Sequence, residues 1–406
     1  MNSSDQYDVV IVGAGPVGAS LAACLRDTDL RIALVDRVMP TALDLREIDH
    51  RVFAITRASE RILTGIGAWD EIAGQRVSPY AAMHVWDAAS SGEIHFEASN
   101  IGQENLGHII ENKVLTYAIH QQLAHQKNVT RIGDAALAAM TQQARGWTLQ
   151  FENGQSIQAG MLIGADGAHS QVRTLAGMQT RGWAYQQQAL VSTVSTEFSH
   201  EYTAWQRFLP TGPLAFLPLS TGQSSIVWSV DSAQAEALLA LDEVAFRRQL
   251  GDSFDHRLGD ILASSSPVGF DLHLQHTPKY IGHRLALVGD AAHSIHPLAG
   301  QGVNLGLLDA ASLAEVILTA MQNKRDFAEH SELRKYERWR KGQNLLMMGA
   351  MDGFKRLFGS ELPPVTLLRS LGMHWLNRFG PVKNHIIEHA MGLRGDLPRL
   401  ARGGYL

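Results

Sequence analysis

Alternating apolar runs and glycine-rich turns organise the first part of the chain. Tyr7–Val12 is predicted to be a strand, Gly13–Gly18 a turn, Ala19–Arg26 a helix and Arg31–Val35 a second strand. Helical spacing predicts further helices near 59–72 and 114–126. Asn153-Gly154 predicts a hairpin, and a short apolar strand at Met161–Gly164 follows it. This order is typical of a parallel α/β unit with additional strands.

The pattern changes in the middle of the chain. Between about 183 and 274, strands of an antiparallel sheet are predicted at Ala189–Thr196, Ala215–Leu219 and Ser225–Val230. Ala233–Phe254 has helical spacing. The α/β pattern then returns, with elements predicted at the following ranges: a buried strand at Arg284–Val288, a helix at Gly302–Met321 and amphipathic helices over about 331–393. One lobe therefore combines the beginning, middle and end of the chain, with a β-rich lobe inserted.

Composition narrows the classes of function. The 35 Lys and Arg residues face 40 Asp and Glu, a net charge of −5, which excludes the electrostatic footprint of a nucleic-acid-binding protein. No basic cluster indicates a membrane anchor, no signal peptide precedes the first strand, and we find no apolar run long enough to span a bilayer. Cys24 is the single cysteine, so an internal disulfide and a thiolate metal cage are excluded. We expect a cytoplasmic protein.

The strongest local motif is Gly13-Ala14-Gly15-Pro16-Val17-Gly18, between an apolar strand and a helix. Gly13 permits a tight turn, Gly15 lets a pyrophosphate approach the backbone, and Gly18 lets helix and strand pack closely. The helix N-terminus favours phosphate. Asp36 ends the second strand about 20 residues on, as a ribose contact requires, and its charge would repel a 2′-phosphate. These residues predict a site for an ADP-containing dinucleotide. The alternative is a purely structural glycine turn beside a surface Asp, which would have the same sequence pattern.

A second motif indicates which dinucleotide. Leu285–Asp290 is an apolar strand that ends in an aspartate, at the edge where open α/β sheets place ligands. The loop 291–306 that follows can present several backbone N–H groups to a flat polar ring edge. An NAD dehydrogenase would be expected to complete its doubly wound domain without this interruption.

With these motifs the sequence resembles the flavoprotein aromatic hydroxylases of the para-hydroxybenzoate hydroxylase class. The resemblance rests on the glycine turn, on Gly164-Ala165-Asp166-Gly167-Ala168-His169-Ser170, and on Gly289-Asp290 with its Pro297 loop. It implies that Asp290 binds the ribityl chain, that Asp166 lies near the pyrophosphate where NAD(P)H also approaches, and that Arg51 reaches the FAD. The residues expected to bind FAD are Gly13, Gly15, Pro16, Val17, Gly18, Asp36, Arg37, Arg51, Asp166, Asp290, Pro297, Gly300, Gly302, Val303 and Asn304.

The same resemblance implies an α/β fold: a Rossmann-like FAD-binding lobe interleaved with a β-sheet substrate lobe, followed by a C-terminal helical region. The predicted divisions are 1–80, 111–182 and 275–330 for the FAD-binding lobe, 81–110 and 183–274 for the substrate lobe, and 331–406 for the helical region. No catalytic side chain is assigned. His293 and His296 are interpreted as loop residues near the flavin rather than zinc ligands, because Pro297 disrupts their spacing and no carboxylate ligand follows.

Within the class, the chain is most similar to the ubiquinone-biosynthesis hydroxylases, for example at 107–112, 215–219, 293–306 and 334–338. One departure is Asp36, where relatives often have the longer Glu. The resemblance implies that NAD(P)H or another donor reduces FAD and that a flavin hydroperoxide hydroxylates a polyprenylated phenol, with O2 as co-substrate. It also implies a possible biosynthetic protein assembly and a peripheral position at the inner face of the membrane. The amphipathic C-terminal region, including 345–348, is either a contact surface for this purpose or ordinary core packing.

Two positions of hydroxylation remain open. The segments 106–112, 187–191, 224–229 and 254–259 resemble the enzyme that acts early on 2-polyprenylphenol, at ring carbon 5. Segments 204–206 and 362–364 resemble the enzyme that acts late, at ring carbon 6. We favour ring carbon 5. The same cofactor motifs also fit a flavin reductase, a halogenase, whose Trp-x-Trp-x-Ile-Pro stretch we do not find, or a non-catalytic flavin-binding subunit.

Overall fold

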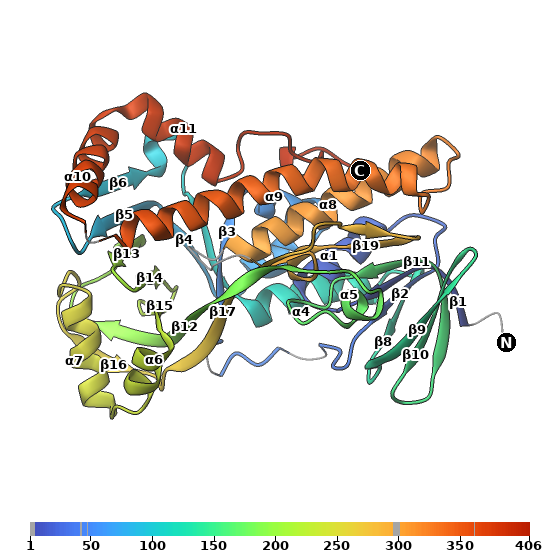
Figure 1. Ribbon diagram of the computed structural model, residues 1–406, viewed down its shortest axis with the longest axis horizontal. Coiled ribbons are helices and arrows are strands. Elements are labelled where there is room, and N and C mark those ends of the chain that lie inside the picture. Colours follow the sequence, from blue (N-terminus) through green and yellow to red (C-terminus); the bar gives the residue numbers. More distant parts are fainter. Residues whose placement is uncertain (1–4, 41–42, 47, 295–300, 361) are drawn as a thin grey trace.

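A central parallel sheet organises one end of the molecule. The computed structural model, shown in Figure 1, describes residues 5–406 except 41–42, 47, 295–300 and 361. Strand β1 (Gln6–Val12) lies in the middle and pairs in parallel with β2 (Ile32–Val35) and β11 (Ser156–Gly164). The sheet order is β18-β19-β11-β1-β2-β8, and β9 and β10 extend it through β11. The remaining bounds are β8 Val129–Ile132, β9 Leu137–Gln143, β10 Gly146–Phe151, β18 Ile281–Gly282 and β19 Leu285–Leu287.

Helices with small residues pack closely on this sheet. Helix α1 (Pro16–Cys24) is buried along most of its length and packs against α8 (Gln301–Gln322), while α4 (Asn112–Ala124) packs on its other side. Pro16 is at its N-terminus, where the missing N–H costs nothing. By length and composition Gly302–Gln322 could cross a membrane, contrary to our interpretation of the sequence, but 78% of its apolar window is buried. It is the core helix of this lobe.

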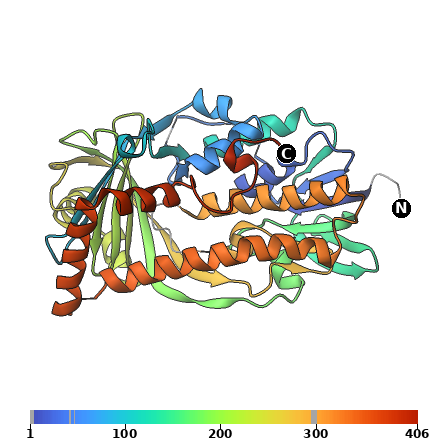
Figure 2. The ribbon, with the colours of Figure 1, turned by 90° about the horizontal axis from the view of Figure 1, so that it is seen from above.

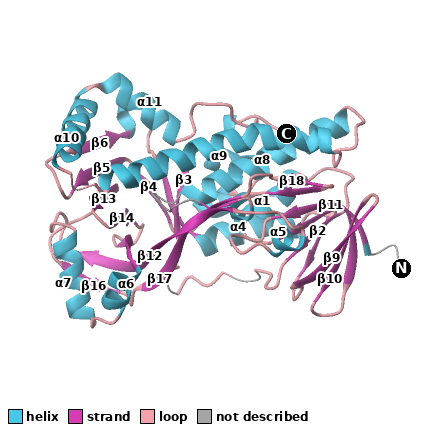
Figure 3. Cartoon of the chain, viewed as in Figure 1, coloured by secondary structure: helices cyan, strands magenta, loops and turns pink. Residues whose placement is uncertain are grey.

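A nine-stranded sheet forms the opposite end (Figures 1 and 3). Its order is β20-β17-β12-β15-β14-β13-β5-β6, and β16 pairs with β12. Neighbouring strands are antiparallel except β13 and β5. The bounds are β5 Ala82–Asp87, β6 Glu93–Glu97, β12 Arg181–Thr196, β13 Thr203–Leu209, β14 Gly212–Pro218, β15 Ser224–Asp231, β16 Ile261–Ser264, β17 Val268–His276 and β20 His293–Ser294. The observed α/β architecture confirms the predicted fold class; the lobe boundaries stay a prediction.

The two faces of the nine-stranded sheet have different partners. Side chains alternate along a strand, so Leu214 and Phe216 point into a core with α6 (Ser232–Leu239) and α7 (Glu243–Ser253). Ala215 and Leu217 point to the opposite face, toward the first lobe. A small third sheet bridges the lobes, made of β3 (Val52–Thr56), β7 (Gly107–Glu111) and β4 (Val77–Tyr80).

Two predicted helices are each divided in the structure. The helix expected at 59–72 is α2 (Arg57–Gly65) and α3 (Trp69–Ala73), because Gly67 turns the backbone with φ +80°. The helix expected at 233–254 is divided into α6 and α7, because the carboxylate of Asp242 accepts the Ala245 N–H and starts a new helix. The apolar spacing continues across both breaks, but the glycine turn at Gly67 and the helix cap at Asp242 end one helix and start the next.

The C-terminal region is helical, as predicted. Helix α9 (His330–Phe358) runs from the parallel sheet to the substrate lobe, and α10 (Pro363–Arg378) and α11 (Gly380–Ala390) turn back beside β5 and β6 (Figure 2). A short 3₁₀ turn, η5 (Leu400–Arg402), returns to α2, and a Cβ on Gly65 would lie 2.5 Å from the side chain of Leu400. The chain end is thereby packed against the first lobe.

Candidate cofactor site and cavity

The glycine turn after β1 has the form that a phosphate-binding loop requires. Gly13 has φ +111°, and a Cβ there would lie 2.3 Å from the carbonyl oxygen of Ala165. A Cβ on Gly18 would lie 2.0 Å from the carbonyl oxygen of Gly13. A Cβ on Gly15, by contrast, meets nothing within 4 Å. Gly13 and Gly18 are therefore demanded by packing within the protein, whereas Gly15 leaves open space before the N-terminus of α1.

Asp36 and His120 brace this turn from two sides. Oδ2 of Asp36 accepts the main-chain N–H of Ala14 at 2.6 Å, and Oδ1 accepts the N–H of Val38 at 3.2 Å. Nε2 of His120 lies 2.8 Å from the Ala14 carbonyl oxygen and must donate to it. Burial lowers the pKa of His120, and the bond to Ala14 partly opposes that shift. Arg37, the next predicted residue, is exposed beside this carboxylate in sequence.

The second motif, after β11, is held by Asp166 and Arg173. Asp166 accepts Ser170 Oγ–H at 2.5 Å and the Val172 N–H at 3.1 Å, at the start of α5 (Gln171–Leu175). Burial raises the pKa of Asp166, and these bonds oppose the rise. The guanidinium of Arg173 donates to the carbonyl of Ala168 at 2.7 Å and to that of Ala291 at 2.9 Å. Arg173 thus ties the second motif to the third, which are more than 100 residues apart in sequence.

The third motif, after β19, brings Asp290 to the cavity between the lobes. Gly289 has φ +59°, and a Cβ there would lie 3.3 Å from the side chain of Val17 in the glycine motif. Asp290 is exposed toward the cavity yet surrounded by protein atoms, which raises its pKa; His293 and Arg51 oppose the rise and Asp309 adds to it. Val17 of the glycine turn therefore lies next to Gly289, which brings the turn close to Asp290, as expected for two motifs that share a ligand.

A fully buried ionic network supports the Gly289-Asp290 loop from below. Oδ2 of Asp309 accepts the Gly289 N–H at 3.1 Å and Nε2–H of His293 at 2.5 Å. Oδ1 accepts from Arg340 Nε at 2.8 Å and from Asn344 Nδ2 at 3.1 Å. Burial would raise the pKa of Asp309, but His293 and Arg340 lower it to about 2. Among the described residues, no group of three or more His, Cys, Asp and Glu side chains could hold a metal ion.

The start of α8 faces the same cavity. Gly302 and Val303 line it, so the positive end of the helix dipole points toward it. The side chain of Asn304 is turned away: it donates to the Ala54 carbonyl at 2.8 Å and accepts the Thr56 N–H at 3.0 Å. Only the main chain of Asn304 is left to meet a ligand. The predicted residues Pro297 and Gly300, and His296, lie outside the described residues.

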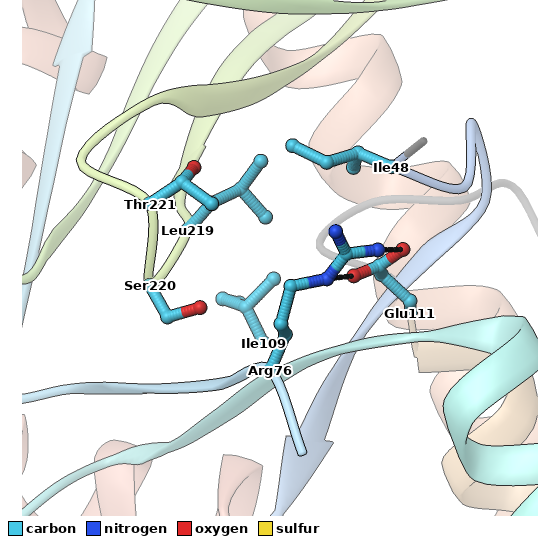
Figure 4. Close-up of a pocket in the computed structure, with 7 residues that line it drawn as sticks. All are labelled: Ile48, Arg76, Ile109, Glu111, Leu219, Ser220 and Thr221. Atoms are coloured by element: carbon cyan, nitrogen blue, oxygen red, sulfur yellow. Dashed lines mark hydrogen bonds and ion pairs between the residues drawn. The ribbon is translucent and has the colours of Figure 1, made fainter. Parts of the chain in front are cut away.

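Arg51 also lines the cavity, and hydrogen bonds hold the loop that carries it. The guanidinium of Arg51 lies over the Phe270 ring, 4.9 Å from the centroid. The main-chain N–H of Arg51 donates to Oδ1 of Asp49 at 3.0 Å. Asp49 also donates its own N–H to Glu111 at 2.7 Å. Glu111 forms a two-point ion pair with Arg76 at 2.8 and 2.9 Å, shown in Figure 4. A water-sized cavity of about 10 Å³ beside this pair is lined also by Ile48, Ile109, Leu219, Ser220 and Thr221.

The cavity between the lobes measures about 700 Å³. One wall belongs to the dinucleotide-binding lobe and contains Arg51, Gly167, Ala168, Asp290, Gly302 and Val303. The other wall is the inner face of the nine-stranded sheet and is mainly apolar, with Ala189, Val191, Ala215, Leu217, Val227 and Leu272. Besides Arg51 and Asp290, the polar residues that line the cavity are His50, His169, Gln206, Asp271, His273 and Ser294. A polar ring edge at one wall and an apolar aromatic compound at the other would fit this division.

These residues fit FAD. The open space at Gly15 accommodates a pyrophosphate at a helix N-terminus, and Asp36 follows the adjacent strand β2, beside the glycine turn. Asp290, Gly302, Val303 and Arg51 all line one cavity. Sequence reasoning missed His120, Arg173 and the buried Asp309 network. Asp309 stands in an apolar helix, and a charged residue at such a position is a signal that could have identified it. Arg340 and Asn344 lie in a helix with many charged residues and give no such signal.

Comparison with known proteins agrees with this site. The family model for the FAD binding domain matches residues 6–346. Ubiquinone hydroxylase UbiL of Rhodospirillum rubrum is 39% identical over 98% of this chain and 92% of its own length. Mitochondrial ubiquinone biosynthesis monooxygenase COQ6 of Xenopus tropicalis is 37% identical over 95% and 93%. The 3-demethoxyubiquinol 3-hydroxylase of Escherichia coli is 34% identical over 95% and 98%.

Solved structures support the fold at lower identity. The p-nitrophenol 4-monooxygenase PnpA of Pseudomonas putida superposes with a TM-score of 0.78 at 19% identity, over 95% of this chain and 98% of its own. HpxO of Klebsiella pneumoniae, complexed with FAD and uric acid, has a TM-score of 0.73 at 18% identity, over 96% and 97%. Fold, site and family model together define a flavoprotein aromatic monooxygenase with FAD as its cofactor. More specifically, the chain belongs to the FAD-dependent hydroxylase family of ubiquinone biosynthesis.

Proposed function

We propose that this protein hydroxylates the aromatic ring of a polyprenylated phenol, and that it acts at ring carbon 5. One atom of O2 replaces a ring hydrogen as hydroxyl, and the other leaves as water. The two electrons and two protons that balance this reaction come from NAD(P)H and solvent. The observation that carries the proposal is the cavity of about 700 Å³, whose sheet wall is apolar and whose opposite wall contains Asp290, Gly302 and Val303.

The bound FAD supplies the oxygen-transfer chemistry, and this chain supplies position and a dry site. The backbone at Gly15 would hold the pyrophosphate at the start of α1, where Gly13 and Gly18 let the turn and helix pack closely. Asp36 would hold the adenosine ribose. Asp290 would accept hydrogen bonds from the ribityl chain. The first N–H groups of α8 point at the cavity and would stabilise negative charge on a ring edge there.

The apolar sheet wall would orient the phenol ring and exclude water from the reacting carbon. Ala215, Leu217 and Val227 present small and branched side chains that leave room for a planar ring. Arg51, held over Phe270, would keep positive charge beside the phosphates or ring. We assign no acid or base: His50, His169 and His273 line the cavity, and no described hydrogen bond places one of them on a reacting atom.

Ring carbon 5 is supported by the resemblance of segments 106–112, 187–191, 224–229 and 254–259 to the early-acting hydroxylase. The competing position, ring carbon 6, is supported by the resemblance of segments 204–206 and 362–364 to the late-acting hydroxylase. Expression in bacterial strains that each lack one ubiquinone-pathway hydroxylase tests the choice. We expect rescue of the strain blocked at carbon 5, with loss of its accumulated intermediate by mass spectrometry. Rescue of the late-step strain alone would overturn the position but not the hydroxylase function.

A further inference from the structure

The exposed apolar side chains of this protein are concentrated in one segment. Of the 21 large hydrophobic residues exposed in the part of the chain that the structure describes, 12 lie between Leu345 and Ile386. We call the exposed side chains of this segment the C-terminal apolar face. It comprises Leu345, Leu346, Phe354, Leu357, Leu362, Leu367, Leu368, Leu371, Trp375, Phe379, Val382 and Ile386. The segment holds about a tenth of the chain, so this concentration is not a general property of the surface.

The spacing of these residues shows that the face is built into the helices. On α10, Leu367, Leu371 and Trp375 are four residues apart and so share one side, and each is more than half exposed. On α11, Val382 and Ile386 repeat the same spacing. Figures 1 and 2 show α10 at the end of the molecule, beside β5 and β6 and far from the N-terminus. The face is therefore an outer edge of the substrate lobe.

The opposite side of α10 is anchored by strong contacts. Arg369 and Asp87 form an ion pair at 2.8 Å in which both side chains are 1% exposed. The Arg369 guanidinium also donates to the carbonyl oxygens of Leu357 and Phe358, at the end of α9. Met373 is buried against the substrate lobe. Because breaking a buried pair leaves an uncompensated charge, this anchor fixes which side of α10 faces out.

The anchoring extends to α11. Lys383 donates to the His95 carbonyl at 3.1 Å, and Asn384 donates to the Asn100 carbonyl at 2.9 Å. Ile387 is buried with Leu106 and Met391. Both helices thus present their polar and ionic contacts inward and their leucines and aromatics outward. This arrangement is the reverse of a water-exposed amphipathic helix, and it indicates an apolar environment on the outside.

The charge of the segment identifies that environment. Residues 345–386 contain Lys355, Arg356, Arg369, Arg378 and Lys383 against Asp352 and Glu361, a net charge of +3. Arg369 is buried and paired with Asp87, so the segment carries +2 without it. Since the whole chain carries −5, the other residues carry −5 − 3 = −8. A cationic apolar patch on an otherwise acidic protein is complementary to an anionic lipid surface. A second copy would bring the same positive charge against it.

The aromatic residues have the chemistry of a membrane interface. Trp375 and Phe379 stack with ring centroids 5.0 Å apart and planes 9° apart, yet both are about half exposed. Arg378, between them in sequence, is exposed. Tryptophan beside a cation is favoured at the level of lipid head groups, where the ring is in the apolar zone and the charge meets phosphate.

We propose that the C-terminal apolar face docks the protein on an anionic lipid bilayer. Docking would bring the protein to the polyprenyl substrate of the proposed function, but the evidence for docking is this surface alone. Of the candidate contact residues 345–348 in the sequence, the structure leaves Leu345 and Leu346 exposed and buries Met348. Most of the face lies instead on α10 and α11.

Vesicle flotation of the purified FAD-loaded protein tests this proposal. We expect binding to vesicles of equal phosphatidylglycerol and phosphatidylcholine, weaker binding to phosphatidylcholine alone, and a further decrease as salt rises. Trp375→Glu should reduce the bound fraction at least tenfold. Phe198→Glu is the matched control, because Phe198 and Trp375 are each 57% exposed and Phe198 lies outside the face. Flavin absorbance and Tm verify that each variant is folded, and Arg378→Gln tests the charge independently.

Three results would overturn the docking proposal: no binding of the wild type to anionic vesicles, equal loss in Trp375→Glu and Phe198→Glu, or a concentration-dependent dimer that Trp375→Glu abolishes without vesicle binding. Hydroxylation of a short-chain, water-soluble prenylphenol without vesicles tests the proposed function separately. If it proceeds while vesicle binding fails, docking is wrong and the hydroxylase function stands. If vesicle binding succeeds while no phenol is hydroxylated, the docking proposal stands and the hydroxylase function is wrong.

Discussion

The main-chain N–H of Ala14 lies 2.6 Å from Oδ2 of Asp36, so the carboxylate that ends β2 also fixes the glycine turn after β1. Asp36 therefore has two tasks, one within the protein and one toward the adenosine ribose. We expect Asp36→Asn to keep an acceptor for Ala14 and to remain folded, with weaker FAD binding. Asp36→Ala loses both tasks, so it should weaken FAD binding by about 1–3 kcal/mol, measured by flavin fluorescence titration. Equal affinity in Asp36→Ala and wild type would contradict the ribose assignment.

Substitutions at Gly15 and Gly18 should have different effects, the first on FAD binding and the second on the stability of the apoprotein. A Cβ at Gly15 meets no protein atom within 4 Å, so Gly15→Val should keep its Tm in the absence of FAD while losing the yellow flavin absorbance. A side chain at Gly18 would collide with the Gly13 carbonyl, so Gly18→Val should lower the apoprotein Tm. Thermal unfolding of both apoproteins and their absorbance with added FAD distinguish the two. A Gly15→Val protein with unchanged FAD affinity would refute the pyrophosphate site.

Filling the apolar wall should block the substrate and spare the cofactor. Ala215→Phe places a ring in the cavity from β14, so we expect turnover of a prenylphenol to decrease at least tenfold while FAD content stays the same. Ala263→Phe is the control, because Ala263 is exposed on the short strand β16, away from the cavity lining. Product formation is followed by mass spectrometry. Unchanged turnover in Ala215→Phe would place the reacting ring elsewhere.

Asp309 makes the folded protein sensitive to acid. Its pKa in the folded state is about 2, below the ordinary 3.8, so its stabilising contribution is present above pH 3.8 and is lost as the pH falls toward 2. A decrease of that size corresponds to about 2 kcal/mol of unfolding free energy. Urea unfolding of wild type and Asp309→Asn between pH 7 and pH 2.5 measures it. The variant should be less stable at pH 7 by about 3–5 kcal/mol and should lose less stability on acidification.

The dinucleotide-binding unit was predictable because its signals are local. Spacing of apolar residues and three glycines predicted β1, the turn, α1 and β2, and the structure places them within a few residues of those bounds. The pairing of β11 and β19 with this unit is non-local, but each strand ends in a recognisable aspartate loop. Resemblance to a family, rather than spacing, decided between NAD and FAD.

Other parts could not be predicted because their causes lie far apart in sequence. Asn304 is predicted to meet the cofactor, but its sequence gives no sign that its side-chain amide meets the β3 main chain some 250 residues earlier. Arg369 gave no signal of its buried partner Asp87, which is 282 residues away. The outward apolar side of α10 has the same spacing as an ordinary core-facing helix. Only the observed contacts of Arg369 reveal which side is buried.

The order of strands in the parallel sheet has a consequence for synthesis of the protein on the ribosome. Strands β1 and β2 emerge first, but their neighbour β11 ends at Gly164 and β19 at Leu287, and Asp309 and Arg340 follow later still. Such long loops must close before their contacts form, which slows folding. An incomplete chain that ends before β19 lacks both Asp290 and the start of α8. The growing polypeptide therefore cannot assemble a redox-competent centre until most of its length has been translated.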